Sequence, residues 1–315
     1  NKGHQIYVVL PLIFEASIEK DFSIDGPREE GSLLIDIDEY SEIALNIYLD
    51  GVAIFSSLLD GKVIESERLL EFGGPSESIT SFAPGDPASR VYSVGTSRGR
   101  GNLFQMEYEL TYPNDRRVVI PRITYPTGKE SLVLDAKGDA IRLISSQFMG
   151  ERGTVVSVTE NGRLLVTTIS VETSFLSEER EIAYETFELN DTSNSLTEIS
   201  LDVEQRNLLA VSSEGILSLW DVSDPKRSTL VDRVSVVEPD DDISALSLLS
   251  GGISVLIGTG SGNLQQWMAV RDANNLYTLK KIRDFESMPT GITNIKPEHF
   301  RKGFGVTDKG GNFAL

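Results

Sequence analysis

The sequence predicts an all-β protein, a six-bladed β-propeller, and two observations lead to this prediction. Six short polar turns containing glycine separate apolar, strand-like runs, and the glycines are Gly51, Gly99, Gly162, Gly215, Gly262 and Gly310. These glycines lie roughly 50 residues apart, a spacing typical of repeats that each supply one four-stranded blade. The clearest repeat aligns residues 208–220 with residues 255–267, because glycine and tryptophan recur together in both.

Residues 33–70 have the pattern of a complete blade. Apolar runs at 33–37 and 43–49 precede the dipeptide Asp50-Gly51, and further runs follow at 52–55 and 62–68. Asp-Gly is typical of a tight hairpin turn. The first run is apolar throughout and the last is mostly charged, as expected when inner strands are buried and outer strands face water.

The same pattern predicts five further blades. They span about 78–125, 139–189, 195–238 and 242–285, and a last blade begins at residue 292 and has three strands. Residues 126–138 lengthen the interval between Gly99 and Gly162, and we interpret them as an insertion with one extra strand at Leu132-Val-Leu. A seventh blade hidden within residues 126–147 is the alternative.

The sequence predicts that a segment near the N-terminus completes the last blade, at the C-terminal end of the chain. Residues 17–24 are strand-like and are expected to supply the missing outer strand of the last blade, which would close the ring and leave no long open edge. Residues 17–315 then form a single propeller domain.

Within residues 1–16, the apolar run 6–14 is too short to cross a hydrocarbon core, which takes about 20 helical residues. It is either a buried leading strand or the end of a transmembrane helix.

Composition argues against several function classes. The chain has 29 Lys+Arg and 48 Asp+Glu, a formal net charge of −19, which disfavours binding to nucleic acid or to anionic membranes. It has no cysteine, which excludes disulfides, thiol catalysis and cysteine-ligated zinc, and its two histidines are His4 and His299. We therefore predict no enzyme activity, no catalytic residue, no metal site and no cofactor.

One segment resembles a known repeat. Residues 211–221 resemble the closing half of a WD-type repeat, with a small-small-acidic-Gly turn and a Trp-Asp ending at Trp220 and Asp221. No Gly-His dipeptide opens any blade, and Trp220 alone is followed by Asp. The hydrogen-bonded tetrad of regular WD blades is therefore expected to be missing, which leaves a degenerate, WD-like propeller held by apolar packing.

A second resemblance lies at the two ends. Residues 7–13 and 297–315 are similar to segments of large permease subunits of bacterial phosphate ABC transporters, some of which carry a propeller-like domain outside the cytoplasm. The resemblance implies a location on the periplasmic face of the inner membrane. It implies attachment to the membrane through segments outside this chain, and partners among other transporter subunits or a solute-binding protein. The family's transport residues lie in membrane helices, so none is carried over.

The leading hypothesis is a non-catalytic interaction or regulatory domain of such a permease. A cytoplasmic WD-repeat scaffold is the alternative, followed by a propeller hydrolase that uses central carboxylates. Candidate partner-binding residues are Asp240, Asp241 and Asp242, between blades four and five, and Arg98 and Arg100, beside Gly99. The plain alternative for both groups is a solvated loop. The aspartates lack the spacing of a calcium-binding EF-hand loop, so no calcium site is predicted there.

Overall fold

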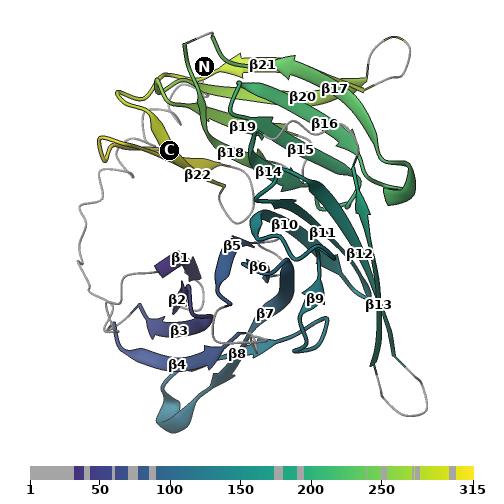
Figure 1. Ribbon diagram of the computed structural model, residues 1–315. Helices are drawn as coiled ribbons and strands as arrows, with labels where there is room; N and C mark the ends of the chain where they lie inside the picture. Colours follow the sequence, from purple (N-terminus) through teal and green to yellow (C-terminus); the bar gives the residue numbers. More distant parts are fainter. Residues whose placement is uncertain are drawn as a thin grey trace.

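The computed structural model is an all-β, six-bladed propeller whose sheets follow one another around a central axis (Figure 1). It describes residues 32–38, 43–58, 61–69, 77–84, 90–173, 180–189, 195–238, 240–249, 254–271, 273, 277–297 and 303–315. Each sheet is antiparallel, and its strands are ordered from the inside outward as they occur in the chain. The prediction of six WD-like blades is therefore confirmed.

The blades are built from the following strands. Blade 1 contains β1 (Ser32–Asp38), β2 (Ile43–Tyr48), β3 (Val52–Ser57) and β4 (Val63–Arg68). Blade 2 contains β5 (Ile79–Pro84), β6 (Val91–Thr96), β7 (Arg100–Thr111) and β8 (Val118–Thr124). Blade 3 contains β10 (Ile141–Met149), β11 (Arg152–Thr159), β12 (Leu164–Thr173) and β13 (Arg180–Glu188).

The second half of the ring repeats this order. Blade 4 contains β14 (Leu196–Leu201), β15 (Asn207–Ser212), β16 (Ile216–Asp221) and β17 (Thr229–Ser235). Blade 5 contains β18 (Ile243–Leu249), β19 (Ser254–Thr259), β20 (Leu264–Arg271) and β21 (Tyr277–Asp284). Blade 6 contains β22 (Ile292–Pro297), β23 (Phe304–Asp308) and β24 (Phe313–Ala314). Two short 3-10 helices, η1 (Pro113–Asp115) and η2 (Pro225–Arg227), lie in connections between outer strands.

The insertion between blades 2 and 3 contains the predicted extra strand. Strand β9 (Leu132–Val133) pairs with β7 through Gly101 and Arg100, so it belongs to the sheet of blade 2. Blade 3 then begins at Ile141. The alternative of a seventh blade within residues 126–147 is wrong, because this segment adds one short strand to an existing sheet.

Blade 6 has three strands, as predicted. The segment expected to complete it, residues 17–24, and the apolar run 6–14 both lie outside the described residues. Among the described residues, no helix is long and apolar enough to cross a membrane.

The glycine turns join the second and third strands of each blade. In all six turns a glycine amide donates to the carbonyl oxygen of the residue three positions earlier, which ends the second strand. Positive φ angles occur at Gly51, Gly99, Gly162, Gly215 and Gly262, as expected from the repeat. In blade 6 the prediction of Gly310 is wrong, because the residue with positive φ (+79°) and the turn hydrogen bond is Gly311.

Side-chain hydrogen bonds reinforce these turns. In five blades the last residue of the second strand accepts a hydrogen bond from the amide four residues later, and these residues are Thr96, Thr159, Ser212, Thr259 and Asp308. These hydrogen bonds therefore act in addition to the apolar packing that the sequence predicts. A hydroxyl or carboxylate fixes most turns, although no Gly-His dipeptide opens any blade.

The innermost strands share a second regular feature. All six have a register shift, characteristic of a β-bulge, directly after their first residue. In three of them the bulged residue donates to the carbonyl of the first residue in the next blade's innermost strand. These bonds are Thr80 to Ile141 (2.8 Å), Arg142 to Leu196 (2.6 Å) and Ser244 to Ile292 (2.6 Å). They link neighbouring blades around the central axis.

The hydrophobic core lies between blades. Five clusters of buried side chains join blades 1 and 2, 2 and 3, 3 and 4, 4 and 5, and 5 and 6. Trp220 is buried between blades 3 and 4, and Trp267 between blades 4 and 5. The repeated tryptophans thus fill equivalent positions, each on the third strand of its blade.

Candidate functional site

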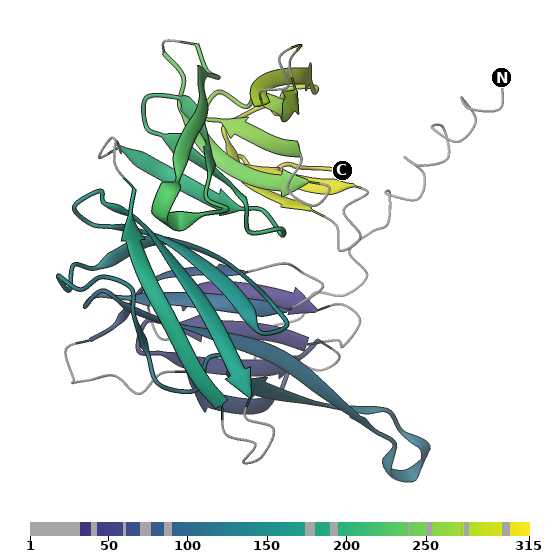
Figure 2. The same ribbon diagram turned by 90° about the vertical axis from the view of Figure 1, so that its right-hand side faces the viewer.

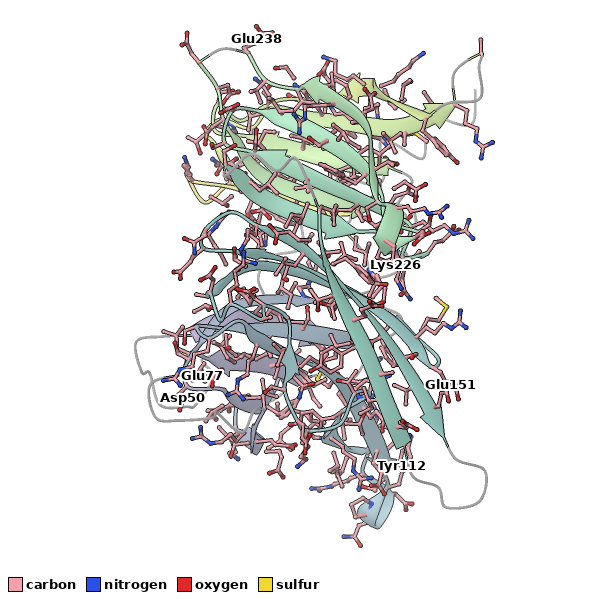
Figure 3. All side chains as sticks on the ribbon, turned by 45° about the vertical axis from the view of Figure 1, so that its right-hand side comes forward. Asp50, Glu77, Tyr112, Glu151, Lys226 and Glu238 are labelled. Atoms are coloured by element: carbon pink, nitrogen blue, oxygen red, sulfur yellow. The ribbon has the colours of Figure 1, made fainter. Side chains whose placement is uncertain are left out.

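The propeller has two different faces. The glycine turns and the connections between blades lie on one face, which we call the turn face, and the remaining connections lie on the opposite face, which we call the groove face. Figure 3 shows Asp50 and Glu77 on the turn face, and Lys226 and Glu151 on the groove face. All five predicted site residues are on the turn face. Arg98 and Arg100 belong to blade 2 and the three aspartates precede blade 5, so the two groups lie on opposite sides of a six-bladed ring.

Arg100 is used inside blade 2. Its guanidinium forms an ion pair with Glu77, whose side chain is completely buried, and Nε donates to Glu77 Oε1 at 3.0 Å. Thr96 also donates to this carboxylate, at 2.7 Å. The hydrogen bond to Glu77 raises the pKa of Arg100. Arg100 therefore compensates a buried charge, while Arg98 is exposed beside it.

The three aspartates also have different environments. Asp241 accepts hydrogen bonds from the Ser261 amide (2.9 Å) and hydroxyl (2.5 Å), which connects the blade 4–5 loop to the turn of blade 5. Partial burial raises the pKa of Asp241, but these hydrogen bonds outweigh burial and lower it. Asp240 and Asp242 are exposed. Of the predicted acidic group, these two are available to a partner.

A third polar cluster on the turn face was not predicted. Arg163, in the turn of blade 3, pairs with Asp135 at 2.5 Å, Asp139 at 2.7 Å and Glu188 at 3.6 Å. Burial raises the pKa of Asp135, but hydrogen bonds from Arg163 and from backbone amides have a larger effect. The pKa of Asp135 therefore lies below its usual value. Like Arg100 and Asp241, Arg163 connects a loop between blades to the next turn.

The innermost strands whose side chains are described supply little material for carboxylate catalysis. In the five innermost strands whose side chains are described (β5, β10, β14, β18 and β22), Glu198 is the single acidic residue. Burial raises the pKa of Glu198. Two-carboxylate hydrolysis needs a second acid within reach, and these five strands do not supply one. Over the described part of the chain, no group of three His, Cys, Asp or Glu residues is placed to hold a metal ion.

The groove face contains a hollow of about 1190 Å³ between blades 3, 4 and 5. Blade 3 contributes one wall, from the start of β11, residues 168–172 of β12 and residues 183–185 of β13. Blade 4 contributes the other wall, from residues 204–207 at the start of β15, from Asp221 at the end of β16 and from Ser223 after it. Arg271 and Tyr277 of blade 5 complete the lining. We call this hollow the groove.

Two contacts hold the walls together. Thr154 donates from its hydroxyl to Gln205 Oε1 at 2.9 Å, which joins β11 to the β14–β15 connection. Lys226, in η2, pairs with Glu185 of β13 at 3.4 Å and lies 5.6 Å from the centre of the Phe187 ring. The groove is therefore bounded by polar contacts that cross from blade 3 to blade 4.

The lining is charged and aromatic. Arg152 and Arg206 are exposed, and neither guanidinium has a partner among the described residues. Tyr184 and Tyr277 are exposed large side chains, and the Arg271 guanidinium donates to Tyr277 Oη at 3.3 Å. The acidic lining residues are Glu172, Glu185, Glu204 and Asp221. Such a surface can bind carboxylates through arginine, and a flat side chain against tyrosine.

Sequence reasoning missed the groove because its residues come from three blades. No local motif joins Arg152, Gln205 and Tyr277. A usable signal did exist for the turns, since a Thr, Ser or Asp three residues before the glycine recurs in five of the six turns. That signal locates the blades and gives no information about the groove.

Comparison with known proteins supports the fold. No protein-family model matches the chain, and no curated protein sequence matches it. Among solved structures, the β-propeller domain of Cps50 (Swd1) from Myceliophteria thermophila is similar with a TM-score of 0.54 and 11% identity, over 92% of this chain and 87% of that one. The propeller of Dos1 is similar with a TM-score of 0.54 and 12% identity, over 89% of this chain and 65% of that one. At these identities, the comparisons establish that the chain has the fold of a WD-like β-propeller.

Proposed function

We propose that this protein is a non-catalytic interaction module and that its groove binds an extended segment of a partner protein. The observation that carries the proposal is that Arg152 and Arg206 line the same hollow of a chain whose net charge is −19. Both guanidiniums are exposed, and neither has a partner among the described residues. Guanidinium groups bind carboxylates with two parallel hydrogen bonds. The bound segment is therefore expected to carry Asp or Glu opposite these arginines.

The character of the lining favours a peptide over a small molecule. Small-molecule sites are mostly apolar and enclose about 300–1,000 Å³. This groove is larger, at about 1190 Å³, and charged residues of both signs line it. Tyr184 and Tyr277 offer contact area for an apolar side chain between the charged groups.

The permease resemblance supplies a more specific version of this proposal. In that version the propeller lies on the periplasmic face of the inner membrane and binds a transporter subunit or a solute-binding protein. The terminal segments 7–13 and 297–315 support it. Exposed residues of the turn face, Arg98, Asp240 and Asp242, would form a second contact with the same assembly.

The experiment compares charge-reversed forms in a pull-down from the native source. Arg152→Glu plus Arg206→Glu is expected to reduce partner recovery at least tenfold, because it places carboxylates opposite carboxylates. Lys137→Glu plus Lys280→Glu is the control, since it makes the same change in net charge at two exposed lysines outside the groove. Equal recovery by the two forms contradicts the groove proposal.

The identity of the recovered partner tests the more specific version. Recovery of transporter components from native membranes supports the permease domain. Recovery of cytosolic proteins alone contradicts it and favours the scaffold alternative. The reading frame around this segment provides an independent test, because about 20 apolar residues running into residues 6–14 are required for a transmembrane helix.

A further inference from the structure

A β-hairpin made of the outer parts of β7 and β8 extends beyond the other strands of blade 2 (Figure 2). Strand β6 pairs with β7 only as far as Gln105, whereas β7 continues to Thr111 and remains paired with β8. We call residues 107–120 the arm. It leaves the blade on the groove face, where the third and fourth strands of each blade are joined.

The arm carries large apolar side chains on both of its faces. Leu110 is 51% exposed, Tyr112 63%, Val118 39% and Ile120 41%. Leu110 pairs with Val119 and Thr111 pairs with Val118, so Leu110 and Tyr112 lie on one face while Val118 and Ile120 lie on the other. An arm packed flat against its own blade would bury one of these faces. Here both are open.

The outer part of the arm also differs in charge from the rest of the chain. Residues 110–120 carry Asp115, Arg116 and Arg117, a net charge of +1, whereas the whole chain carries −19. Tyr112 lies six residues beyond the buried Met106, which is about 20 Å along a strand. Electrostatic screening at physiological salt acts over about 8 Å. The tip is therefore largely screened from the negative charge of the propeller body.

We propose that the arm inserts into an apolar cleft of a partner protein whose rim is acidic. An acidic partner is repelled by most of this molecule, and the outer part of the arm, beyond Glu107 and Glu109, presents Arg116 and Arg117 to the rim. Its two apolar faces match the two walls of a cleft. In the described part of the chain, β7 beyond Met106 is paired with β8 and with no other strand, so each strand of the arm has an edge whose backbone groups a protein cleft can satisfy by hydrogen bonding.

A lipid surface fits the arm less well. Residues 113–117, which form the tip, are Pro-Asn-Asp-Arg-Arg and would have to enter the membrane before the four apolar side chains. The hydrocarbon layer also supplies no hydrogen-bond partners for strand edges. The order of polar and apolar residues therefore favours a protein cleft.

The test uses photo-crosslinking amino acids incorporated into the full-length protein in its native cells. Positions 112 and 120 report on the two faces of the arm, and position 64 is the control, because Ile64 is an exposed apolar residue of β4 in blade 1. Positions 112 and 120 are expected to crosslink to one protein, at an apolar segment flanked by Asp or Glu. Position 64 is expected not to reach that segment.

Variants then identify the cause of the contact. Two double variants should each reduce the crosslink at least tenfold. The first is Arg116→Glu plus Arg117→Glu. The second is Tyr112→Ser plus Ile120→Ser, for which the crosslinker is placed at position 118. Val63→Ser plus Ile64→Ser should leave it unchanged. None of these arm variants should lower the melting temperature, because the side chains are exposed. The groove variant Arg152→Glu plus Arg206→Glu should leave the arm crosslink in place, which separates this inference from the proposed groove function.

Four outcomes overturn the proposal. They are equal crosslinking from position 64, crosslinking to a second copy of this chain, a target segment rich in Lys and Arg, and arm-dependent co-sedimentation with phosphatidylglycerol vesicles. The last of these would identify the arm as a lipid-binding element.

Discussion

In five of the six blades, the residue that ends the second strand closes the turn with its side chain. Four blades use a threonine or serine hydroxyl there, and blade 6 uses the carboxylate of Asp308. Asp308 accepts hydrogen bonds from the Asn312 amide at 2.7 Å and from the Thr290 amide at 3.1 Å. Burial raises the pKa of Asp308, but the hydrogen bond from the Asn312 side-chain amide (2.9 Å) and these two backbone bonds outweigh it and lower the pKa to about 2.

This shift predicts a pH-dependent contribution to stability. An unfolded aspartate has a pKa of about 3.9. Because the folded pKa is lower, Asp308 stabilises the fold at pH values above about 4, and this contribution is lost as the pH falls through about 2. Asp308→Asn should therefore lower the urea midpoint at pH 7 and at pH 5, and the difference from wild type should shrink between pH 4 and pH 2.5. Asp240→Asn, at an exposed carboxylate, is the control. A difference that stays constant down to pH 2.5 contradicts the argument.

At the scale of single residues, the sequence predicted where the candidate partner-binding residues lie better than it predicted what they do. Arg98 and the three aspartates lie in turns or loops, whereas Arg100 is the first residue of β7. The roles of Arg100 and Asp241 in fixing those loops were not visible, because Glu77 and Ser261 lie about 20 positions away in the chain. Pairing across such a separation depends on the fold, and local pattern does not report it.

At the scale of elements, the glycine turns made the blades predictable because each turn needs a positive φ angle that glycine adopts without strain. Strand β10 shows where this reasoning stopped. Its middle contains Ser145, Ser146 and Gln147, which break the apolar pattern. Ser145 accepts from the Leu201 amide at 3.0 Å and Gln147 donates to the Leu201 carbonyl at 3.2 Å, so part of this polarity serves contact with blade 4.

Two turn glycines provide a matched test of these elements. Gly262 and Gly311 both have positive φ, but a Cβ atom at Gly262 would lie 2.4 Å from the Met288 carbonyl oxygen, whereas nothing lies within 4 Å at Gly311. Gly311→Ala should lower the free energy of unfolding by about 1 kcal/mol through backbone strain alone. Gly262→Ala should cost about 1–3 kcal/mol more, because backbone atoms of the adjoining loop must move. Urea denaturation measures both, and equal losses would show that the loop before blade 6 yields easily.

At the scale of the whole molecule, blade number and order followed from the repeat, and the functional surfaces did not. The groove is assembled from connections in blades 3, 4 and 5, and the arm is recognisable only because β7 continues past the end of its pairing with β6. Both features depend on how far each strand extends in three dimensions. A periodic pattern gives the positions of strands and says little about these extensions.

Net charge is the property of the whole molecule that sequence predicts directly, and it has a measurable consequence. A charge of −19 on a compact ring produces self-repulsion that salt screens. Raising NaCl from about 20 to about 300 mM at pH 7 should therefore raise the melting temperature, since the Debye length falls from roughly 20 Å to below 8 Å. At pH 5, close to the isoelectric point of about 4.6, the same addition should have a much smaller effect. A melting temperature that falls with salt at pH 7 would contradict this. It would show that ion pairs such as those of Arg163 with Asp135 and Asp139 outweigh the repulsion between the acidic residues.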